Sequence, residues 1–252
     1  MTKMLLVGCN GRMGKVITEL AAGDPDIVIA AGVDVAGECA GKYPVAASFE
    51  EIRAEDLDVI VDFSSPAVFD AMLDYALANK LPVVVCTTGM SEEQIARLNE
   101  AAKEIAVLRS ANMSLGINLL MKLVREAAQT LAKAGFDIEI VERHHNQKKD
   151  APSGTALALA DSINEGLDNA CEYVYDRSDR LQKRDPKEIG ISAVRGGTIP
   201  GTHEVIFAGT DEVVELTHMA YSRSIFGKGA ISAAKFLAGK SPKFYSMADV
   251  IG

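Results

Sequence analysis

A glycine-rich turn near residue 10 joins a short apolar run to a helical pattern. Residues 4–7 are Met-Leu-Leu-Val, and the segment from Gly8 to Gly14 then places glycine at the spacing G-x-x-G-x-x-G. Apolar side chains recur at helical spacing over residues 12–22. Glycine lets the backbone approach a pyrophosphate with no Cβ in the way, and a helix N-terminus offers unpaired N–H groups. The pattern therefore predicts a strand, a phosphate-binding loop and a helix, which together open a dinucleotide-binding fold.

Further apolar runs alternate with helical patterns as far as about residue 110. The runs cover residues 27–33, 58–63, 82–86 and 105–108. Pro66 suits the first turn of one helix, and Ser91 is a candidate N-cap for the next. Strands that are apolar throughout are buried on both faces, and the absence of Trp leaves mainly aliphatic side chains to fill such a core. These features predict an α/β fold with an N-terminal Rossmann-type, doubly wound parallel sheet.

The pattern changes after residue 114. We expect a long amphipathic helix, a strand, a second helix after Pro152-Ser153, three strands and a last helix. The first helix covers residues 115–134 and the last helix covers 224–238. The first strand covers 136–144, and the three later strands cover 191–196, 203–209 and 212–219. The polar stretch 171–190 predicts an irregular, mobile loop. The sequence thus predicts a second, α+β domain over residues 115–222, built on an open mixed sheet. Residues 1–114 form the dinucleotide-binding domain, and residues 223–252 are expected to pack back on it.

The composition limits which binding partners and which cellular location we expect for the protein. The net charge of −9 argues against nucleic acid as a partner, although a local basic cluster can still bind a small anion. No apolar run reaches the ~18 residues of a membrane span, and no signal-peptide pattern precedes residue 4. The four cysteines, which are Cys9, Cys39, Cys86 and Cys171, show neither a C-x-x-C pair nor zinc-like spacing. We therefore expect a cytoplasmic protein with no membrane partner and no metal site.

An acidic residue stands where a ribose contact is expected. Asp34 lies twenty residues after Gly14, at the end of the second apolar run, and can accept hydrogen bonds from ribose hydroxyls. Its carboxylate would repel a 2′-phosphate, and Val35 and Ala36 provide no compensating arginine, so we expect NADH to be favoured over NADPH. Arg12 could still reach a phosphate. Two alternatives stay open: a strand–helix turn without a ligand, and a solvated acid at a strand end.

Residues 142–155 gather three kinds of reactive group. They read Glu-Arg-His-His-Asn-Gln-Lys-Lys-Asp-Ala-Pro-Ser-Gly-Thr, with a helix expected to start at Ser153-Gly154-Thr155. Imidazoles, fixed cations and free backbone N–H groups suit a small polyanion whose protonation changes during a reaction. A solvated basic loop beside a capped helix is one alternative. A metal site is another, although His144 and His145 would point to opposite faces of a strand.

This segment resembles a known family. The pattern E-x-H-H-x-x-K-x-D-A-P-S-G-T-A is the signature of dihydrodipicolinate reductase. The glycine loop resembles the family's cofactor loop, and other segments resemble its nicotinamide contacts and its C-terminal half. Those segments are Asp62-Phe63-Ser64, Thr87-Thr88-Gly89, the stretch from Ser110 to Gly116, Arg195-Gly196-Gly197, Gly201-x-His203, and the stretch from Ser222-Arg223 to Gly229-Ala230. The resemblance covers nearly the whole chain.

The resemblance implies an activity and a set of site residues. The family reduces 4-hydroxy-tetrahydrodipicolinate, or its dihydro form, to tetrahydrodipicolinate in diaminopimelate and lysine biosynthesis, using NADH or NADPH. It implies that His144 is a general acid and Lys148 a second catalytic residue, and that the small dicarboxylate substrate contacts His145, Lys148, Gly154 and Thr155. It also implies a homotetramer assembled through the sheets of the second domain. The implied cofactor contacts are Gly8, Asn10, Gly11, Arg12, Met13, Gly14, Asp34, Phe63, Thr87, Thr88, Gly89, Ala111, Asn112 and Met113.

The sequence departs from the family pattern at two positions, and two other functions stay open as alternatives. Met113 stands where the family commonly has Phe, and Ser65 stands where some members have Arg beside the cofactor. A different two-domain oxidoreductase would explain the glycine loop but not residues 142–155. A non-enzymatic, NAD-responsive regulator would need a DNA-binding or partner element, and the sequence shows no basic helix-turn-helix pattern.

Overall fold

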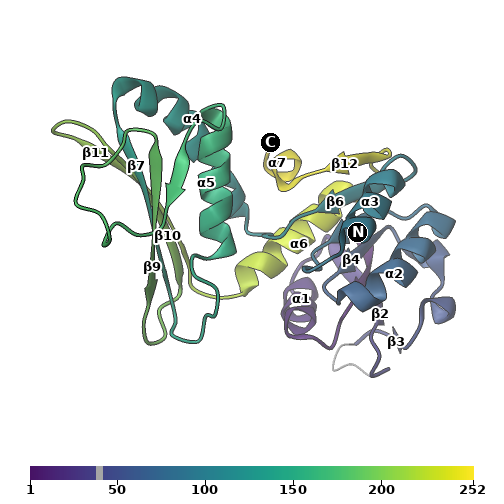
Figure 1. Cartoon of the computed structure of the whole chain (residues 1–252). Coiled ribbons are helices and arrows are strands. Elements are labelled where there is room, and N and C mark those ends of the chain that lie inside the picture. The colour runs from purple at the N-terminus through teal and green to yellow at the C-terminus, as the bar shows by residue number, and fades with distance from the viewer. Residues whose placement is uncertain (38–41) are drawn as a thin grey trace. The chain divides into compact units, whose positions relative to one another are not determined.

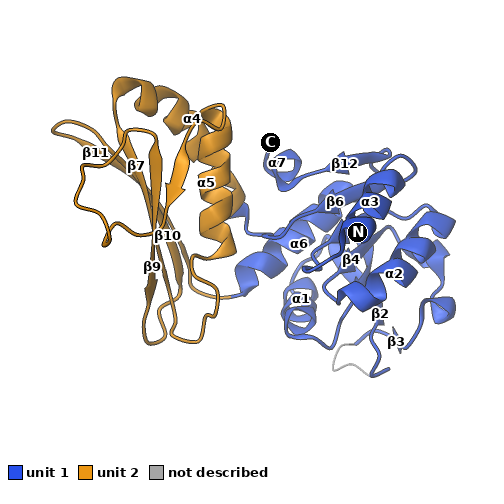
Figure 2. Ribbon diagram, in the orientation of Figure 1, with its two compact units in different colours: residues 1–115, 223–252 blue, residues 116–222 orange. Residues whose placement is uncertain are grey.

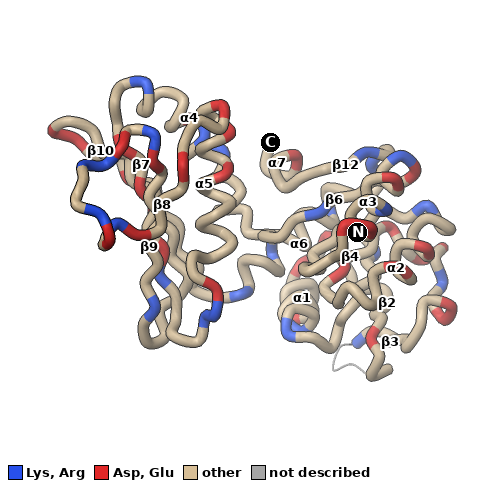
Figure 3. Tube along the Cα trace, viewed as in Figure 1, with Lys and Arg blue, Asp and Glu red and all other residues tan. Residues whose placement is uncertain are grey.

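The chain divides into two compact units. The computed structural model describes residues 1–37 and 42–252, so Cys39 lies outside the described residues. Unit 1 comprises Met1–Leu115 and Arg223–Gly252, and unit 2 comprises Gly116–Ser222 (Figures 1 and 2). Acidic and basic residues are interspersed along both units (Figure 3). None of the helices in the described part of the chain combines the length and apolarity that a bilayer crossing requires.

Unit 1 is built on a parallel sheet. Within the described residues this sheet has seven strands in the order β12-β6-β5-β4-β1-β2-β3. The strands are β1 (Thr2–Val7), β2 (Ile27–Val33), β3 (Val45–Ala46), β4 (Val59–Asp62), β5 (Val83–Val85), β6 (Ala106–Arg109) and β12 (Lys243–Tyr245). The helices are α1 (Arg12–Ala22), α2 (Pro66–Asn79), α3 (Glu92–Ala101), α6 (Ser224–Leu237) and α7 (Met247–Ile251). The predicted Rossmann-type fold is confirmed.

Alternate side chains of the central strands enter two separate cores. Met4 and Leu6 pack in one core with residues of α1 and α6, whereas Leu5 and Val7 pack in the other with residues of α2 and α3. Burial on both faces explains why these strands read as continuous apolar runs. The predicted helix starts are also confirmed. Pro66 is the first residue of α2, and the side chain of Ser91 accepts a hydrogen bond from the backbone of Gln94 as an N-cap.

Two short strands and one short α-helix of unit 1 were not predicted. The strand β3 has two residues and β12 has three, and each extends one edge of the sheet by parallel pairing. A run of two or three residues is too short to show a periodicity, so only the neighbouring strand defines it. The five-residue helix α7 was missed for the same reason.

Unit 2 is built on a mixed sheet. Its five strands among the described residues follow the order β11-β10-β7-β9-β8. They are β7 (Asp137–His144), β8 (Glu172–Val174), β9 (Glu188–Arg195), β10 (Gly201–Ala208) and β11 (Val213–Ala220). The strands β7, β8 and β9 are parallel, and β10 runs antiparallel to both β7 and β11. Residues of helices α4 (Leu115–Leu131) and α5 (Gly154–Gly166) pack with Ile138, Ile140 and Phe207 in one core. The predicted mixed sheet is confirmed.

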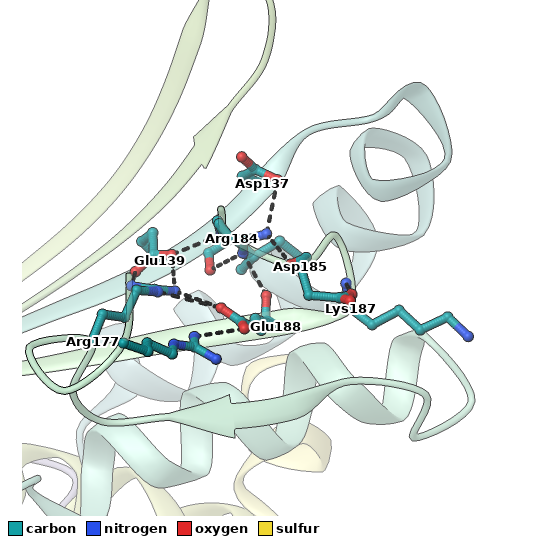
Figure 4. A network of polar contacts seen from close by, with 9 residues as sticks. Asp137, Glu139, Arg177, Arg184, Asp185, Lys187 and Glu188 are labelled. Atoms are coloured by element: carbon teal, nitrogen blue, oxygen red, sulfur yellow. Dashed lines mark hydrogen bonds and ion pairs between the residues drawn. The ribbon is translucent and has the colours of Figure 1, made fainter. Parts of the chain in front are cut away.

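The prediction of an irregular loop over residues 171–190 is partly wrong. Within this stretch β8 pairs with β9, and the arginines that follow it bind carboxylates of the sheet (Figure 4). Arg177 and Arg184 both reach Glu139 on β7, at 2.7 and 2.9 Å, and Arg180 reaches Glu188 at 2.6 Å. Glu139 lies 38 and 45 residues from these two arginines along the chain. Local polarity alone therefore suggested a loop, whereas the structure has a segment bound to the sheet.

Candidate active site

The carboxyl ends of three strands meet where the strand order of unit 1 reverses. The strand β1 lies between β2 and β4, and parallel strands present their carboxyl ends at one edge of the sheet. A cavity of about 560 Å³ opens there. Its lining includes Gly8, Gly11, Asp34, Phe63, Ser65 and Glu50. The position is the one at which open α/β sheets bind ligands.

The glycine loop leaves the backbone at this edge uncovered. Gly8 has φ +78°, and a Cβ on it would lie 2.7 Å from the carbonyl oxygen of Phe63. A Cβ on Gly14 would overlap the backbone carbonyls of Gly8 and Cys9. Gly11 is the N-cap of α1 and has no side chain with which to cap the first N–H groups. The loop and the helix start therefore fit the pyrophosphate of a dinucleotide.

Asp34 is fixed at the wall of the cavity. Its Oδ2 accepts a hydrogen bond from the backbone N–H of Asn10 at 3.0 Å, which links the end of β2 to the glycine loop. The buried side-chain nitrogen of Asn10 has no hydrogen-bond partner among the described residues. Glu50 adds a second carboxylate to the lining, and the described lining residues include neither Lys nor Arg. Arg12 is exposed as the first residue of α1.

A buried acid ties the ends of β4 and β5 together. Asp62 is fully buried and accepts hydrogen bonds from the hydroxyl of Thr87 at 2.7 Å and from the backbone N–H of Ser64 at 2.9 Å. Burial raises the pKa of Asp62, and these hydrogen bonds act in the opposite direction. Phe63 lies in the turn from Asp62 to Ser64, which the hydrogen bond from the backbone N–H of Ser64 to Asp62 closes. Thr88 and Gly89 follow directly after Thr87.

The segment after β6 lies partly in the core. Ala111 and Asn112 follow β6, and Met113 is 2% exposed within the core that also contains α6. A Cβ on Gly229 of α6 would overlap the carbonyl of Met113, so the two backbones are in close contact. The departure from the family's Phe thus falls at a core position of unit 1.

In unit 2, the end of β7 carries a carboxylate and an imidazole on the same face. Glu142 and His144 are two residues apart, and side chains alternate along a strand. The Nδ1 atom of His144 lies 2.6 Å from Oε2 of Glu142, which is fully buried. Burial holds the pKa of His144 below its usual value, although Glu142 acts to raise it.

Arg195 and the start of α5 hold the same carboxylate. The guanidinium of Arg195 donates to both oxygens of Glu142 at 2.7 Å, and the backbone N–H of Ser153 donates to Oε1 at 2.9 Å. Burial acts to raise the pKa of Glu142, but the hydrogen bonds from Arg195 and His144 outweigh it and hold the pKa below its usual value. Glu142 is therefore an anion in the folded protein.

A second histidine, His203, packs against His144. The edge-to-face rings of His203 and His144 have centroids 5.1 Å apart, and Nε2 of His203 lies 2.9 Å from the hydroxyl oxygen of Ser153. Burial lowers the pKa of His203 to about 4, so this imidazole is neutral at neutral pH. The Nδ1 atom of His203 has no hydrogen-bond partner in the part of the chain that the structure describes.

One group of the predicted anion site is paired with a carboxylate. Lys148 forms an ion pair with Asp150 at 2.9 Å, and the hydrogen bond from Lys148 lowers the pKa of Asp150. Gly154 is exposed, and a Cβ there would meet nothing within 4 Å. Thr155 follows in the first turn of α5, whereas Nδ1 of His145 accepts a hydrogen bond from the backbone of Gln147.

Sequence reasoning gave no role to Glu142, Arg195 or His203. Strand alternation could have placed Glu142 beside His144. The other two depend on strand register, which pairs His144 with Arg195 and Glu142 with His203. No group of three or more His, Cys, Asp or Glu side chains that could hold a metal ion occurs within residues 1–37 and 42–252.

Comparisons with known proteins identify the family. Residues 2–113 match the family model "Dihydrodipicolinate reductase, N-terminus" and residues 116–251 match the model of its C-terminus. A 4-hydroxy-tetrahydrodipicolinate reductase of Caldanaerobacter subterraneus subsp. tengcongensis is 51% identical over 251 residues, covering 100% of this chain and 98% of the relative. One of Clostridium tetani is 46% identical, covering 98% and 96%. The dipicolinate-bound dihydrodipicolinate reductase from Paenisporosarcina sp. TG-14 has a TM-score of 0.82 at 23% identity, covering 98% and 97%. The chain therefore belongs to the dihydrodipicolinate reductase family.

Proposed function

We propose that this chain is a 4-hydroxy-tetrahydrodipicolinate reductase that uses NAD(P)H and forms tetrahydrodipicolinate for diaminopimelate and lysine biosynthesis. Relatives with that name align with it over its full length. The observation that carries the proposal is the position of Lys148, which is paired with a carboxylate, close to His144 and just before the exposed start of α5 at Gly154. A dicarboxylate substrate needs such an anion site next to a proton donor.

The substrate carboxylate takes the place of the Asp150 carboxylate. Lys148 supplies the charge, and the backbone N–H groups of Gly154 and Thr155 supply directional donors at the start of α5. His145 lies between β7 and Lys148 and contributes a further polar contact. The open space in front of Gly154 admits the ligand without a side chain in the way.

The hydride comes from the reduced nicotinamide when it is bound. Reduction of a conjugated C=C–C=N system leaves negative charge on the substrate, which must be neutralised by a proton. His144 donates this proton from Nε2, because its Nδ1 is engaged by Glu142. A Cβ on Gly201 would lie 3.0 Å from Nε2 of His144, so the glycine keeps the space beside that nitrogen open. Imidazole suits this role because it titrates near the working pH.

The cofactor binds at the carboxyl edge of the unit 1 sheet. Its pyrophosphate lies on the loop from Gly8 to Gly14, and its ribose is held by Asp34. Asp34 and Glu50 place two carboxylates in the cavity with no basic residue among its described lining, and Ser65 is there as well. NADH is therefore the preferred cofactor, since a 2′-phosphate meets repulsion without a compensating cation. The remaining contacts are Asn10, Arg12, Met13, Phe63, Thr87, Thr88, Gly89, Ala111, Asn112 and Met113.

The chain assembles as a homotetramer through the sheet of unit 2. Helices α4 and α5 pack on one face of this sheet. By strand alternation the other face carries Val194, Val213 and Met219, whose exposed fractions are 42%, 56% and 43%. Exposed apolar side chains gathered on one face favour association with another copy. Analytical ultracentrifugation tests this, and a monomer at micromolar concentration contradicts it.

The activity is tested with substrate generated from pyruvate and aspartate semialdehyde. We expect NADH oxidation that depends on this substrate, with a higher kcat/KM for NADH than for NADPH. No turnover with either cofactor contradicts the proposed activity. Turnover only with another substrate of a panel supports a different oxidoreductase, and a strong preference for NADPH contradicts the cofactor assignment alone.

A further inference from the structure

Glu142 accepts hydrogen bonds from three residues around it, which are His144, Ser153 and Arg195. Its side chain is fully buried on β7, and each of its oxygens accepts two hydrogen bonds. Oε2 is bound by His144 and Arg195, and Oε1 is bound by Arg195 and the backbone of Ser153. A buried carboxylate with this many donors is held in one orientation.

The hydrogen bond to Glu142 determines which nitrogen of His144 keeps its proton in both the neutral and the charged form of the ring. An ionised carboxylate can only accept hydrogen bonds, so Nδ1 of His144 must donate to Glu142. Nε2 is then the nitrogen that gains and loses a proton. Gly201 leaves space beside this nitrogen.

We propose that Glu142 is a positioning residue for the reaction, which holds the Nδ1 proton of His144, aims Nε2 at the substrate and stabilises the imidazolium form that burial disfavours. The inference rests on the proposed function, in which His144 is the proton donor. A buried acid that orients a catalytic imidazole and stabilises its charged form acts in the same way in Ser-His-Asp triads.

The charges around His144 show why this acid matters. Burial, Lys148 and Arg195 all lower the pKa of His144, and Glu142 raises it. His203, which faces the ring from β10, is neutral because burial lowers its pKa to about 4. The other nearby carboxylate, Asp150, is paired with Lys148. Loss of the Glu142 charge therefore leaves His144 among cations and lowers its pKa further.

The same carboxylate also supports the anion site. Ser153 directly precedes Gly154, and its backbone N–H is bound to Glu142. Arg195 also donates to the backbone oxygen of Asp150 at 2.6 Å, next to the start of α5. Gln at position 142 can still accept hydrogen bonds from Ser153 and Arg195 but provides no charge for His144. We therefore expect Glu142→Gln to change kcat more than KM.

The first test compares pH profiles of kcat. Because a nearby opposite charge shifts a pKa by about 1–3 units, the fall of kcat at rising pH should begin about 1–3 units lower in Glu142→Gln. At neutral pH this variant should lose roughly tenfold or more in kcat. Glu142→Asp keeps the charge and should keep the wild-type position of the fall, with a reduced maximum. An unchanged profile in Glu142→Gln overturns the proposal.

Glu188→Gln is the matched control. Glu188 is 5% exposed and binds Arg177 and Arg180, so this variant also removes a buried charge from an arginine cluster in unit 2 (Figure 4). None of the hydrogen bonds and ion pairs described for Glu188 involves His144. We expect the wild-type pH profile. A shift like that of Glu142→Gln would show a general structural effect and overturn the proposal.

The second test needs no substrate. The chain has four histidines, so ¹⁵N-histidine labelling gives few ring signals, and the variant His144→Gln assigns those of His144. In the wild type we expect Nδ1 to stay protonated while Nε2 titrates, and we expect a lower midpoint in Glu142→Gln. A wild type in the opposite tautomer overturns the proposal, even if Glu142→Gln does not fold. Absence of turnover in the wild type contradicts only the proposed function.

Discussion

His203 makes the stability of the protein sensitive to acid. It is 5% exposed, and its Nε2 lies 2.9 Å from the Ser153 hydroxyl oxygen. Burial lowers its pKa from 6.5 to about 4 in the folded protein. The folded state therefore keeps this imidazole neutral over a pH range in which the unfolded chain binds a proton to it. Replacement by Gln removes the titration and keeps a polar side chain.

The sign and size of the effect follow from proton linkage. Between pH 6.5 and about 4 the unfolded state binds more protons at this position, so stability rises with pH across that range. The contribution of His203 is fully present above pH 6.5 and is lost as the pH falls toward 4. At about 1.4 kcal/mol for each pH unit of pKa change, the loss amounts to about 3 kcal/mol.

Urea unfolding followed by circular dichroism measures this loss, because the chain has no Trp for fluorescence. Between neutral pH and pH 4, the wild type should lose about 3 kcal/mol more of its free energy of unfolding than His203→Gln. Thr202→Val is the control, since Thr202 is also buried on β10 but does not titrate. It should change stability equally at each pH. Parallel pH dependence in the wild type and in His203→Gln would refute the reasoning.

Three further changes test the site. His144→Gln should lower kcat by roughly 10²–10⁴-fold, the range for a lost general acid, and a rate near that of the wild type would remove His144 from this role. Lys148→Ala should lower kcat and raise KM about tenfold or more, since a hydrogen bond to a charged group contributes about 1.5–3 kcal/mol; an unchanged KM argues against carboxylate contact. Gly14→Ala places a Cβ against the backbone of Gly8, so calorimetry should show weaker NADH binding, and wild-type affinity would contradict the loop assignment.

Unit 1 could be predicted because its signals are local. The glycine loop, the apolar strands, the first-turn Pro66 and the N-cap Ser91 each lie within a few residues of the element they define. The strands β3 and β12 could not be predicted, because they are defined by pairing with β2 and β6 rather than by a pattern of their own.

The site of unit 2 was only partly predictable for the same physical reason. His144, Lys148 and Gly154 belong to one continuous segment, which sequence reasoning singled out. Arg195 and His203 come from other strands, and their places beside the segment follow from the register of β9 and β10 against β7. The contacts of the arginines after β8 were missed likewise, since the carboxylate of Glu139 on β7 is distant in sequence from Arg177 and Arg184.

The register of this sheet and the assembly of the site depend on each other. The face of β7 toward the helices is apolar at Ile138 and Ile140 and then carries Glu142 and His144. A one-residue slip of β9 would turn Arg195 to the opposite face and leave the buried Glu142 without its cation. Removal of one partner of a buried ion pair costs about 3–5 kcal/mol, so the slipped pairing is disfavoured. The ion pair between Glu142 and Arg195, which orients the proposed proton donor His144, thus also favours the strand register in which this ion pair forms.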